Sequence, residues 1–316
     1  MVTVITDVNM NGELEASVLI PTTGDRGDLL RCSIASVLRQ TEKRLEVLVV
    51  GDGMSANSRK AIEEMARSDN RIRVFDFPKH ENRGEPNRHH ILLHEARGRN
   101  IFYLCDRDLL LPDHVERLGR LLKDADVAHG LMVPIRRDGQ PVIAEYSSIF
   151  GFRGVPDLTK ASHRRLTVKG NGILPLSSWG HTLRFYRKLP RGWETPPAGW
   201  YSDQHMLAQL LAHPGCKVAT TMVPTVLNFQ KCWRGHDAVT VWRHELPLWF
   251  EKLNQPHFAD QFREEVMEKA ILEQQTQIDQ LAATIRFFHR HPLRYVLGKL
   301  KAKLKSRVKA RLKFRN

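Results

Sequence analysis

The chain has 316 residues, of which 41% are hydrophobic and 27% are charged, an ordinary composition for a globular protein with a full core. No stretch approaches the roughly 18 apolar residues of a membrane-spanning helix. Residues 1–15 lack a secretory-signal pattern and are expected to form a polar leader. The net charge of +14 is concentrated at one end. Ten bases and no acid lie between Arg294 and Asn316, which leaves +4 for residues 1–293.

The four cysteines are widely separated, and no two of them form a CxxC pair. Such spacing argues against a metal-binding or redox motif. We therefore expect four reduced thiols, which fits a cytoplasmic protein.

Short apolar runs alternate with helical patterns through the first third of the chain. Strands are predicted at residues 16–21, 45–50, 72–77 and 101–105, and helices at residues 28–40, 57–67, 87–96 and 114–122. This alternation predicts right-handed crossovers and a mostly parallel α/β sheet. In such sheets ligands bind beyond the carboxyl ends of the strands. Three polar clusters follow strands here: Thr22 and Thr23, Asp52, and Asp106 and Asp108.

Asp106 and Asp108 follow the fourth predicted strand and are separated only by Arg107. Unpaired carboxylates at this spacing would repel each other, and a bound cation removes the conflict. Hard oxygen ligands suit Mg²⁺ or Mn²⁺. The alternative is that Arg107 or another base pairs with the acids and no metal binds. Asp52 lies between two glycines, so it either forms a turn or lets a ligand approach the backbone closely.

The second half of the chain has weaker patterns. Residues 131–142 predict a β-hairpin with Asp138 and Gly139 in the turn, and residues 147–172 predict a long loop over the site. An apolar-periodic helix begins near Asp203, which could be only a first-turn acid favoured by the helix dipole. His181 could likewise be a neutral core histidine.

Residues 257–289 predict a long helix with apolar residues at spacings of three, four and seven. Such a seam either packs on the domain or pairs two chains in a homodimer. Beyond Pro292, leucines and a valine repeat between Lys and Arg residues, which predicts a basic amphipathic helix for an anionic membrane surface. Nucleic-acid binding is the competing interpretation. We prefer the membrane because an apolar stripe has no use on a phosphate backbone.

Three segments together resemble the family 2 glycosyltransferases, which have the GT-A fold: LIPTTGDRGDLLRCSIASVLRQT, LEVLVVGDG and ENRGEPNRHHILLHEARGRNIFYLCDRDLLLPDH. The resemblance implies that Thr22, Thr23 and Asp52 contact the nucleoside. It also implies that Asp106 binds on the ribose side, Asp108 binds the metal and Arg88 lies near the nucleotide. The chain has Gly51-Asp52 where the family often has paired acids, and His89 where an asparagine is usual.

The segment from LSSWGHTLRFYRKLPRGW to YSDQHML resembles the C-terminal half of a bacterial subgroup of the same family. The resemblance implies that Asp203 is the general base of an inverting transfer. It gives His181 an acceptor or phosphate contact and makes His236 a candidate additional metal ligand. Four aromatic residues either pack in the core or stack on sugar faces as candidates for the acceptor cleft: Trp179, Trp193, Trp200 and Tyr201.

We therefore expect an α/β protein with a GT-A, Rossmann-like nucleotide-diphospho-sugar transferase fold, a mostly parallel sheet and a C-terminal helical extension. The expected transferase domain covers residues 16–250, with a nucleotide-binding half (16–125) and an acceptor half (126–250). A long helix (251–291) and a basic tail (292–316) follow.

The expected function is metal-dependent, inverting sugar transfer, with Mg²⁺ or Mn²⁺ as cofactor and a nucleotide sugar, UDP-linked by preference, as donor. The expected acceptor is a glycan or lipid-linked molecule of a surface polysaccharide, on the inner face of the cytoplasmic membrane, with no nucleic-acid partner. One alternative is a nucleotidyltransferase, although TTGDRG is a poor match to its basic phosphate loop. The other is a non-catalytic protein that binds membranes or polyanions through the tail.

Overall fold

The computed structural model describes residues 13–142, 158–169 and 174–291. The chain divides into two units, residues 1–263 and residues 264–316. The leader before residue 13, most of the predicted loop at 147–172 and the basic tail lie outside the described residues, so the predictions for them stay predictions.

The described part of the first unit contains an eight-stranded mixed sheet in the order β3-β2-β1-β4-β7-β6-β8-β5. Neighbouring strands among β1 to β4 are parallel, as are β6 and β8, whereas β7 is antiparallel to both of its neighbours. This arrangement confirms the expected α/β fold with a mostly parallel sheet. The strand bounds are β1 (Ala16–Gly24), β2 (Leu45–Met54), β3 (Ile72–Phe77), β4 (Asn100–Tyr103), β5 (Leu109–Leu110), β6 (Val127–Pro134), β7 (Trp179–Thr182) and β8 (Val218–Asn228).

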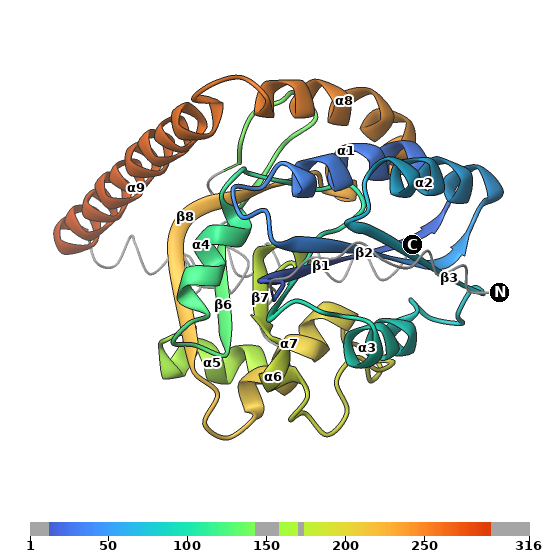
Figure 1. Cartoon of the computed structure of the whole chain (residues 1–316). Coiled ribbons are helices and arrows are strands. Elements are labelled where there is room, and N and C mark those ends of the chain that lie inside the picture. The colour runs from blue at the N-terminus through green and yellow to red at the C-terminus, as the bar shows by residue number, and fades with distance from the viewer. Residues whose placement is uncertain (1–12, 143–157, 170–173, 292–316) are drawn as a thin grey trace, which may run out of the picture. The chain divides into compact units, whose positions relative to one another are not determined.

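Helices cover both faces of this sheet (Figure 1). α1 (Gly27–Leu38), α2 (Ala56–Ser68) and α4 (His114–Leu121) pack on one face, and α3 (Glu85–His94) and α7 (Ser202–Ala212) pack on the other. The strands serve both cores because successive side chains point to opposite faces. In β1, for example, Val18 and Ile20 belong to the core under α1, whereas Leu19 belongs to the core under α3.

The predicted hairpin at residues 131–142 is only partly formed. Its first strand is the end of β6, but β6 pairs with β7 and β8. The turn forms, with Arg136 N donating to Gln140 O, and a single bridge joins Ile135 to Pro141. The prediction was wrong about the pairing partner of residues 131–134. These residues belong to β6, which pairs with strands distant in sequence.

Within the predicted loop at 147–172 the structure contains a helix, α5 (Ala161–Val168). The prediction of a loop was therefore wrong for this part. The guanidinium of Arg164 donates hydrogen bonds to the carbonyl oxygens of Leu211 and Cys216, at the end of α7 and just beyond it. The sequence of α5 has no clear apolar stripe. Its position is fixed by these contacts to a distant segment.

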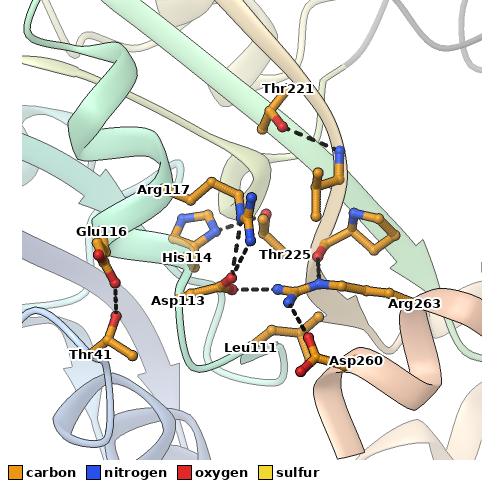
Figure 2. A network of polar contacts seen from close by, with 12 residues as sticks. Thr41, Leu111, Asp113, His114, Glu116, Arg117, Thr221, Thr225, Asp260 and Arg263 are labelled. Atoms are coloured by element: carbon orange, nitrogen blue, oxygen red, sulfur yellow. Dashed lines mark hydrogen bonds and ion pairs between the residues drawn. The ribbon is translucent and has the colours of Figure 1, made fainter. Parts of the chain in front are cut away.

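The first unit also contains α6 (Leu183–Tyr186), which directly follows β7. After β8 come α8 (Ala238–Leu253) and the start of α9 (Phe258–Arg290). Arg263 on α9 pairs with Asp113 at the start of α4 and donates to Pro224 O on β8 at 3.0 Å (Figure 2). Asp113 also accepts two hydrogen bonds from Arg117, so one carboxylate contacts two guanidinium groups. The contacts of Arg263 hold the start of α9 against α4 and β8.

The described part of the second unit continues α9 as far as Arg290, which confirms the long helix predicted for residues 257–289. Its large apolar side chains are exposed: Met267, Ile271, Leu272, Ile278, Leu281, Ile285, Phe287 and Phe288. Several recur at the three- and four-residue spacing of a helix seam. Pairing of two copies through this seam stays a prediction. Among the described residues, every helix is too short or too polar to cross a bilayer.

All four cysteines are free thiols, as expected. Burial raises the pKa of Cys32 and Cys216 to about 11 and that of Cys105 to about 12. Cys232, in the short 3-10 turn Lys231–Trp233 after β8, is exposed.

Candidate functional site

A cleft of about 340 Å³ lies at the carboxyl ends of the central strands. Six residues expected from the sequence line it: Thr22, Thr23, Asp52, Arg88, Asp106 and Asp203. They come from β1, β2, α3, the segment after β4, and α7. The parallel sheet therefore brings together polar groups that are as much as 181 positions apart in the sequence, from Thr22 to Asp203.

Asp52 forms one wall of the cleft and is almost fully buried. Its carboxylate accepts a hydrogen bond from His80 N at 2.6 Å and forms an ion pair with Lys79. Gly84 packs against it with a φ of +68°, and a Cβ atom at Gly84 would lie 3.1 Å from Asp52 Cγ. Asp52 is therefore held rigidly, and the close approach requires a glycine opposite it.

Asp106 lies across the cleft and is 2% exposed. Its carboxylate accepts a hydrogen bond from Thr22 Oγ1 at 3.1 Å. Both carboxylate oxygens also accept from Nη1 of Arg26, at 2.9 and 3.1 Å. A charge-assisted contact of this kind occupies the carboxylate and neutralises it.

Arg107 lines the cleft beside Asp106. Its guanidinium lies 5.3 Å from the ring centre of Trp242 on α8, and Nη1 is 3.9 Å from Asp106 Oδ1. Burial lowers the pKa of Arg107, but the surrounding acidic groups outweigh this effect and raise it overall. The guanidinium is therefore a fixed positive charge in the cleft.

Asp108 does not line the cleft. It is fully buried, and its carboxylate accepts hydrogen bonds from Ser177 Oγ at 2.7 Å, Asn228 Nδ2 at 2.9 Å and Phe229 N at 3.3 Å. Burial raises its pKa, and Arg107 and the hydrogen bonds oppose that rise. Two of these contacts attach the turn that carries Asp108 to the end of β8. In this structure Asp108 therefore stabilises the fold.

The expected pairing of Asp106 and Asp108 on one Mg²⁺ or Mn²⁺ ion is therefore not the arrangement that the structure forms. The carboxylate of Asp108 is enclosed by donors, and that of Asp106 is occupied by Arg26. Among the described residues, no three His, Cys, Asp or Glu side chains are grouped closely enough to hold one ion. In this arrangement the two carboxylates do not form a pair of free ligands for one divalent cation.

Asp203 is half-buried in the first turn of α7, and its Oδ1 accepts from Gln204 N at 3.0 Å. Burial raises the pKa of Asp203, while backbone donors and the charges of Arg88 and Arg83 oppose the rise. The preceding residue, Ser202, donates a hydrogen bond to the buried carboxylate of Glu85 at the start of α3. This bond fixes the beginning of α7 at the cleft.

Arg88 on α3 lines the cleft and is almost fully buried. Its guanidinium donates to Arg83 O at 2.7 Å and lies 5.0 Å from the ring centre of Trp193. Burial lowers its pKa, and the acids near it oppose the change. Arg88 thus adds a second positive charge on the α3 side of the cleft.

The other expected residues lie elsewhere. His181 is fully buried, its Nε2 is 2.7 Å from Tyr103 Oη, and burial lowers its pKa to about 4, so it is a neutral core histidine. Trp200 packs edge-on against His205, and His236 is exposed in the 3-10 turn Gly235–Asp237. Neither lines the cleft. Trp179 and Trp193 are buried with Tyr103 in the core.

Sequence reasoning missed three bases of the cleft, Arg26, Lys79 and Arg83, and treated Arg107 only as a possible partner of the acids. Arg26 and Arg83 lie in the loop TTGDRG and the segment ENRGEP, both of which carried the family resemblance. Glycine beside arginine, in loops that follow strands, was the available signal.

The family model for "Glycosyl transferase family 2" matches residues 17–181, which is more than half of the chain. The chain therefore belongs to the family 2 glycosyltransferases. This membership favours sugar transfer over both alternatives, the nucleotidyltransferase and the non-catalytic protein. A comparison with curated protein sequences gives no match.

Solved structures share the fold at low identity. S. aureus TarS 1–349 is 15% identical with a TM-score of 0.52, and the match covers 68% of this chain and 60% of that one. Its complex with UDP-GlcNAc is 14% identical, with a TM-score of 0.52 and coverage of 80% and 71%. The mannosyltransferase PcManGT from Pyrobaculum calidifontis, in complex with GDP-Man and Mn²⁺, is 16% identical, with a TM-score of 0.51 and coverage of 93% and 81%. These likenesses show that the fold is GT-A.

Proposed function

We propose that the chain transfers a sugar, with inversion, from a nucleoside diphosphate sugar to a hydroxyl group of a glycan or lipid-linked acceptor of the cell envelope. One observation carries the proposal: six residues expected from the family resemblance line a single cleft, and one of them, Asp203, is a carboxylate of raised pKa. The complexes of TarS with UDP-GlcNAc and of PcManGT with GDP-Man support a nucleotide-sugar donor. A UDP-linked donor remains our preference.

The nucleoside binds between Asp52 and Asp106 in this proposal. Asp52 is supported by Lys79 and by the amide of His80, and Thr23 Oγ1 donates to Asp52 O at 2.7 Å. A carboxylate held in this way can accept hydrogen bonds from a base or a ribose without first having to be ordered. Arg88 and Arg83 face the same space and suit the phosphate groups.

Asp203 is the general base. Its carboxylate takes the proton of the acceptor hydroxyl while the hydroxyl oxygen forms a bond to the anomeric carbon. The bond from that carbon to the β-phosphate oxygen breaks, and its electron pair leaves with the nucleoside diphosphate. The raised pKa of Asp203 supports this role because it makes the carboxylate a stronger base than an exposed aspartate.

The metal-dependent form of this mechanism is not part of the proposal. Mn²⁺ accompanies GDP-Man in PcManGT, but Asp106 and Asp108 of this chain do not form a matching pair of ligands. We therefore assign the first two steps, donor binding and deprotonation of the acceptor, to the side chains of the cleft.

We also propose that residues 294–316 attach the enzyme to the anionic inner surface of the cytoplasmic membrane. Ten bases without an acid, separated by an apolar stripe, support this placement. Co-sedimentation with vesicles that contain anionic phospholipid tests it. A protein lacking residues 294–316 should stay in the supernatant, and sedimentation of that variant to the same extent as the full chain would contradict the proposal.

The function is tested by incubating the full chain with UDP-, GDP-, dTDP- and CMP-linked sugars and a mixture of envelope glycans and lipid-linked glycans. The expected result is release of the nucleoside diphosphate from one donor, dependent on acceptor and lost in Asp203→Asn. A second assay supplies nucleoside triphosphates and sugar 1-phosphates in place of the nucleotide sugars, and release of pyrophosphate there would instead indicate a nucleotidyltransferase. If no donor binds and none is consumed, the proposal fails.

A further inference from the structure

The cleft contains more positive than negative charge. Five bases line it, Arg26, Lys79, Arg83, Arg88 and Arg107, against three carboxylates, Asp52, Asp106 and Asp203. A nucleoside diphosphate sugar carries two negative charges on its diphosphate. The side chains of this chain can therefore balance the charge of the donor by themselves.

Arg107 has unused hydrogen-bonding capacity. Its Nε atom is buried and has no hydrogen-bond partner among the described residues, and Nη1 reaches Asp106 only at 3.9 Å. A buried donor without a partner is unfavourable unless a ligand completes it. The indole of Trp242 packs against the guanidinium, which limits its movement away from the cleft.

Arg26 is the second base at this position. Its Nη1 contacts both oxygens of Asp106, its side chain lines the cleft, and 29% of that side chain is exposed. A cation bound to Asp106 would lie close to this guanidinium, and their like charges would repel strongly in a partly desolvated site. Arg26 and a divalent ion therefore compete for the same carboxylate.

We propose that Arg107, with Arg26, supplies the positive charge at the donor's diphosphate, so that the enzyme binds its donor without a divalent cation. Two guanidinium groups can donate paired hydrogen bonds to phosphate oxygens. When the bond to the anomeric carbon breaks, the leaving diphosphate gains one negative charge, and these groups stabilise it as fixed donors. No proton moves to or from either arginine. This inference rests on the proposed function, since it concerns the same donor.

The proposal predicts that nucleotide binding is independent of metal. Titration calorimetry of the full chain with UDP, UDP-GlcNAc and uridine, in EDTA and in Mn²⁺, measures this directly. UDP and UDP-GlcNAc should bind in EDTA with a Kd similar to that in Mn²⁺. GDP and GDP-mannose are titrated in parallel, because the proposal concerns the diphosphate and does not depend on which nucleoside the enzyme prefers.

Variants assign the effect to residues. Arg107→Gln and Arg26→Gln should each weaken UDP binding in EDTA by about tenfold or more, as expected for loss of a charge-assisted hydrogen bond. Uridine binding should not change, because uridine has no diphosphate. Arg107→Lys should recover part of the affinity. The matched control is Arg31→Gln, because Arg31 is an exposed arginine of α1 that pairs with Glu64. This variant should bind UDP normally. Thermal melting checks that each variant is folded.

The outcomes separate this inference from the proposed function. If UDP and UDP-GlcNAc bind only in Mn²⁺, the inference is overturned and sugar transfer stands. Metal-free binding that Arg107→Gln and Arg26→Gln leave intact would also overturn it. If none of the UDP-, GDP-, dTDP- and CMP-linked donors binds under any condition, the proposed function fails first.

Discussion

Ser202 donates a hydrogen bond to Glu85, and this contact joins the first turn of α7 to the first turn of α3. Asp203 follows Ser202 directly, and Arg88 lies three residues after Glu85. We assign Asp203 to the acceptor side of the cleft and Arg88 to the donor side. Glu85 is fully buried and also accepts from Arg83 N at 3.1 Å. One buried carboxylate therefore sets the distance between the two halves of the site.

Replacing Glu85 with alanine should reduce kcat more than it raises the KM for the donor. Ser202 loses its acceptor, so Asp203 is no longer held in position, and misplacement of a catalytic group by a fraction of an ångström costs rate. Steady-state kinetics with varied donor measures the split. Glu85→Gln keeps the shape and one acceptor oxygen and should recover most of the rate. An increase in KM alone would show that Glu85 serves only donor binding.

Asp203→Asn should lower kcat by a factor of about 10² to 10⁴, the usual contribution of a general base. The melting temperature should stay close to that of the unaltered chain, because the amide can still accept the hydrogen bond from Gln204 N. Asp138→Asn, in the exposed turn after β6, is the control. Nearly full activity in Asp203→Asn would remove this residue from the mechanism.

The pH dependence of kcat follows from the same residue. Asp203 must be ionised to accept a proton, and burial raises its pKa above the ordinary value of about 3.9 for an aspartate. The rate should therefore fall as the pH falls through this raised pKa. A pH–rate profile of the unaltered chain measures the acidic limb. A profile that stays flat down to the ordinary aspartate range would contradict the assignment.

Gly84→Ala should weaken nucleotide binding. The added Cβ would lie 3.1 Å from Cγ and 3.2 Å from Cβ of Asp52, and the φ of +68° adds strain of about 1–2 kcal/mol. Gly139→Ala is a matched control, because Gly139 has a φ of +80° but a Cβ there meets nothing within 4 Å. Both variants should lose stability in urea unfolding, but only Gly84→Ala should also lose affinity for UDP. If Gly84→Ala and Gly139→Ala bind UDP with equal affinity, Asp52 does not contribute to donor binding.

Asp108→Ala should destabilise the fold by about 1–3 kcal/mol, because it leaves buried donors of Ser177, Asn228 and Phe229 without their acceptor. Asp108→Asn keeps one acceptor oxygen and should cost less. Urea unfolding compares the two. If Asp108→Ala unfolds like the unaltered chain but loses binding of Mn²⁺, Asp108 is a metal ligand after all.

The sequence was sufficient for the elements whose patterns are local. The apolar runs of β1, β2 and β4 and the stripe of α1 appear at or near the predicted residues, and the rule that ligands bind at strand ends brought Thr22, Asp52 and Asp106 together. Asp203 joined them through the family resemblance, since its local pattern was equally that of a first-turn acid.

The rest depends on contacts between distant segments. The direction of the Asp108 side chain is set by Asn228, 120 positions later, and α5 is fixed by Arg164 bonding beyond α7. The same holds for His181, whose partner Tyr103 lies 78 positions earlier. No local pattern encodes such pairings. For this reason two carboxylates one residue apart could be predicted to act together although one of them faces the core.

The contrast among the four thiols has a practical consequence. Burial raises the pKa of Cys32, Cys105 and Cys216 and so makes their reactive thiolate form scarce, whereas Cys232 is exposed. A maleimide dye should therefore attach selectively to Cys232, without prior removal of any other cysteine. Cys232 lies between Asn228, which contacts Asp108, and Trp242, which packs on Arg107. The natural chain thus provides its own attachment point for a fluorescent reporter beside the segment that supports the cleft.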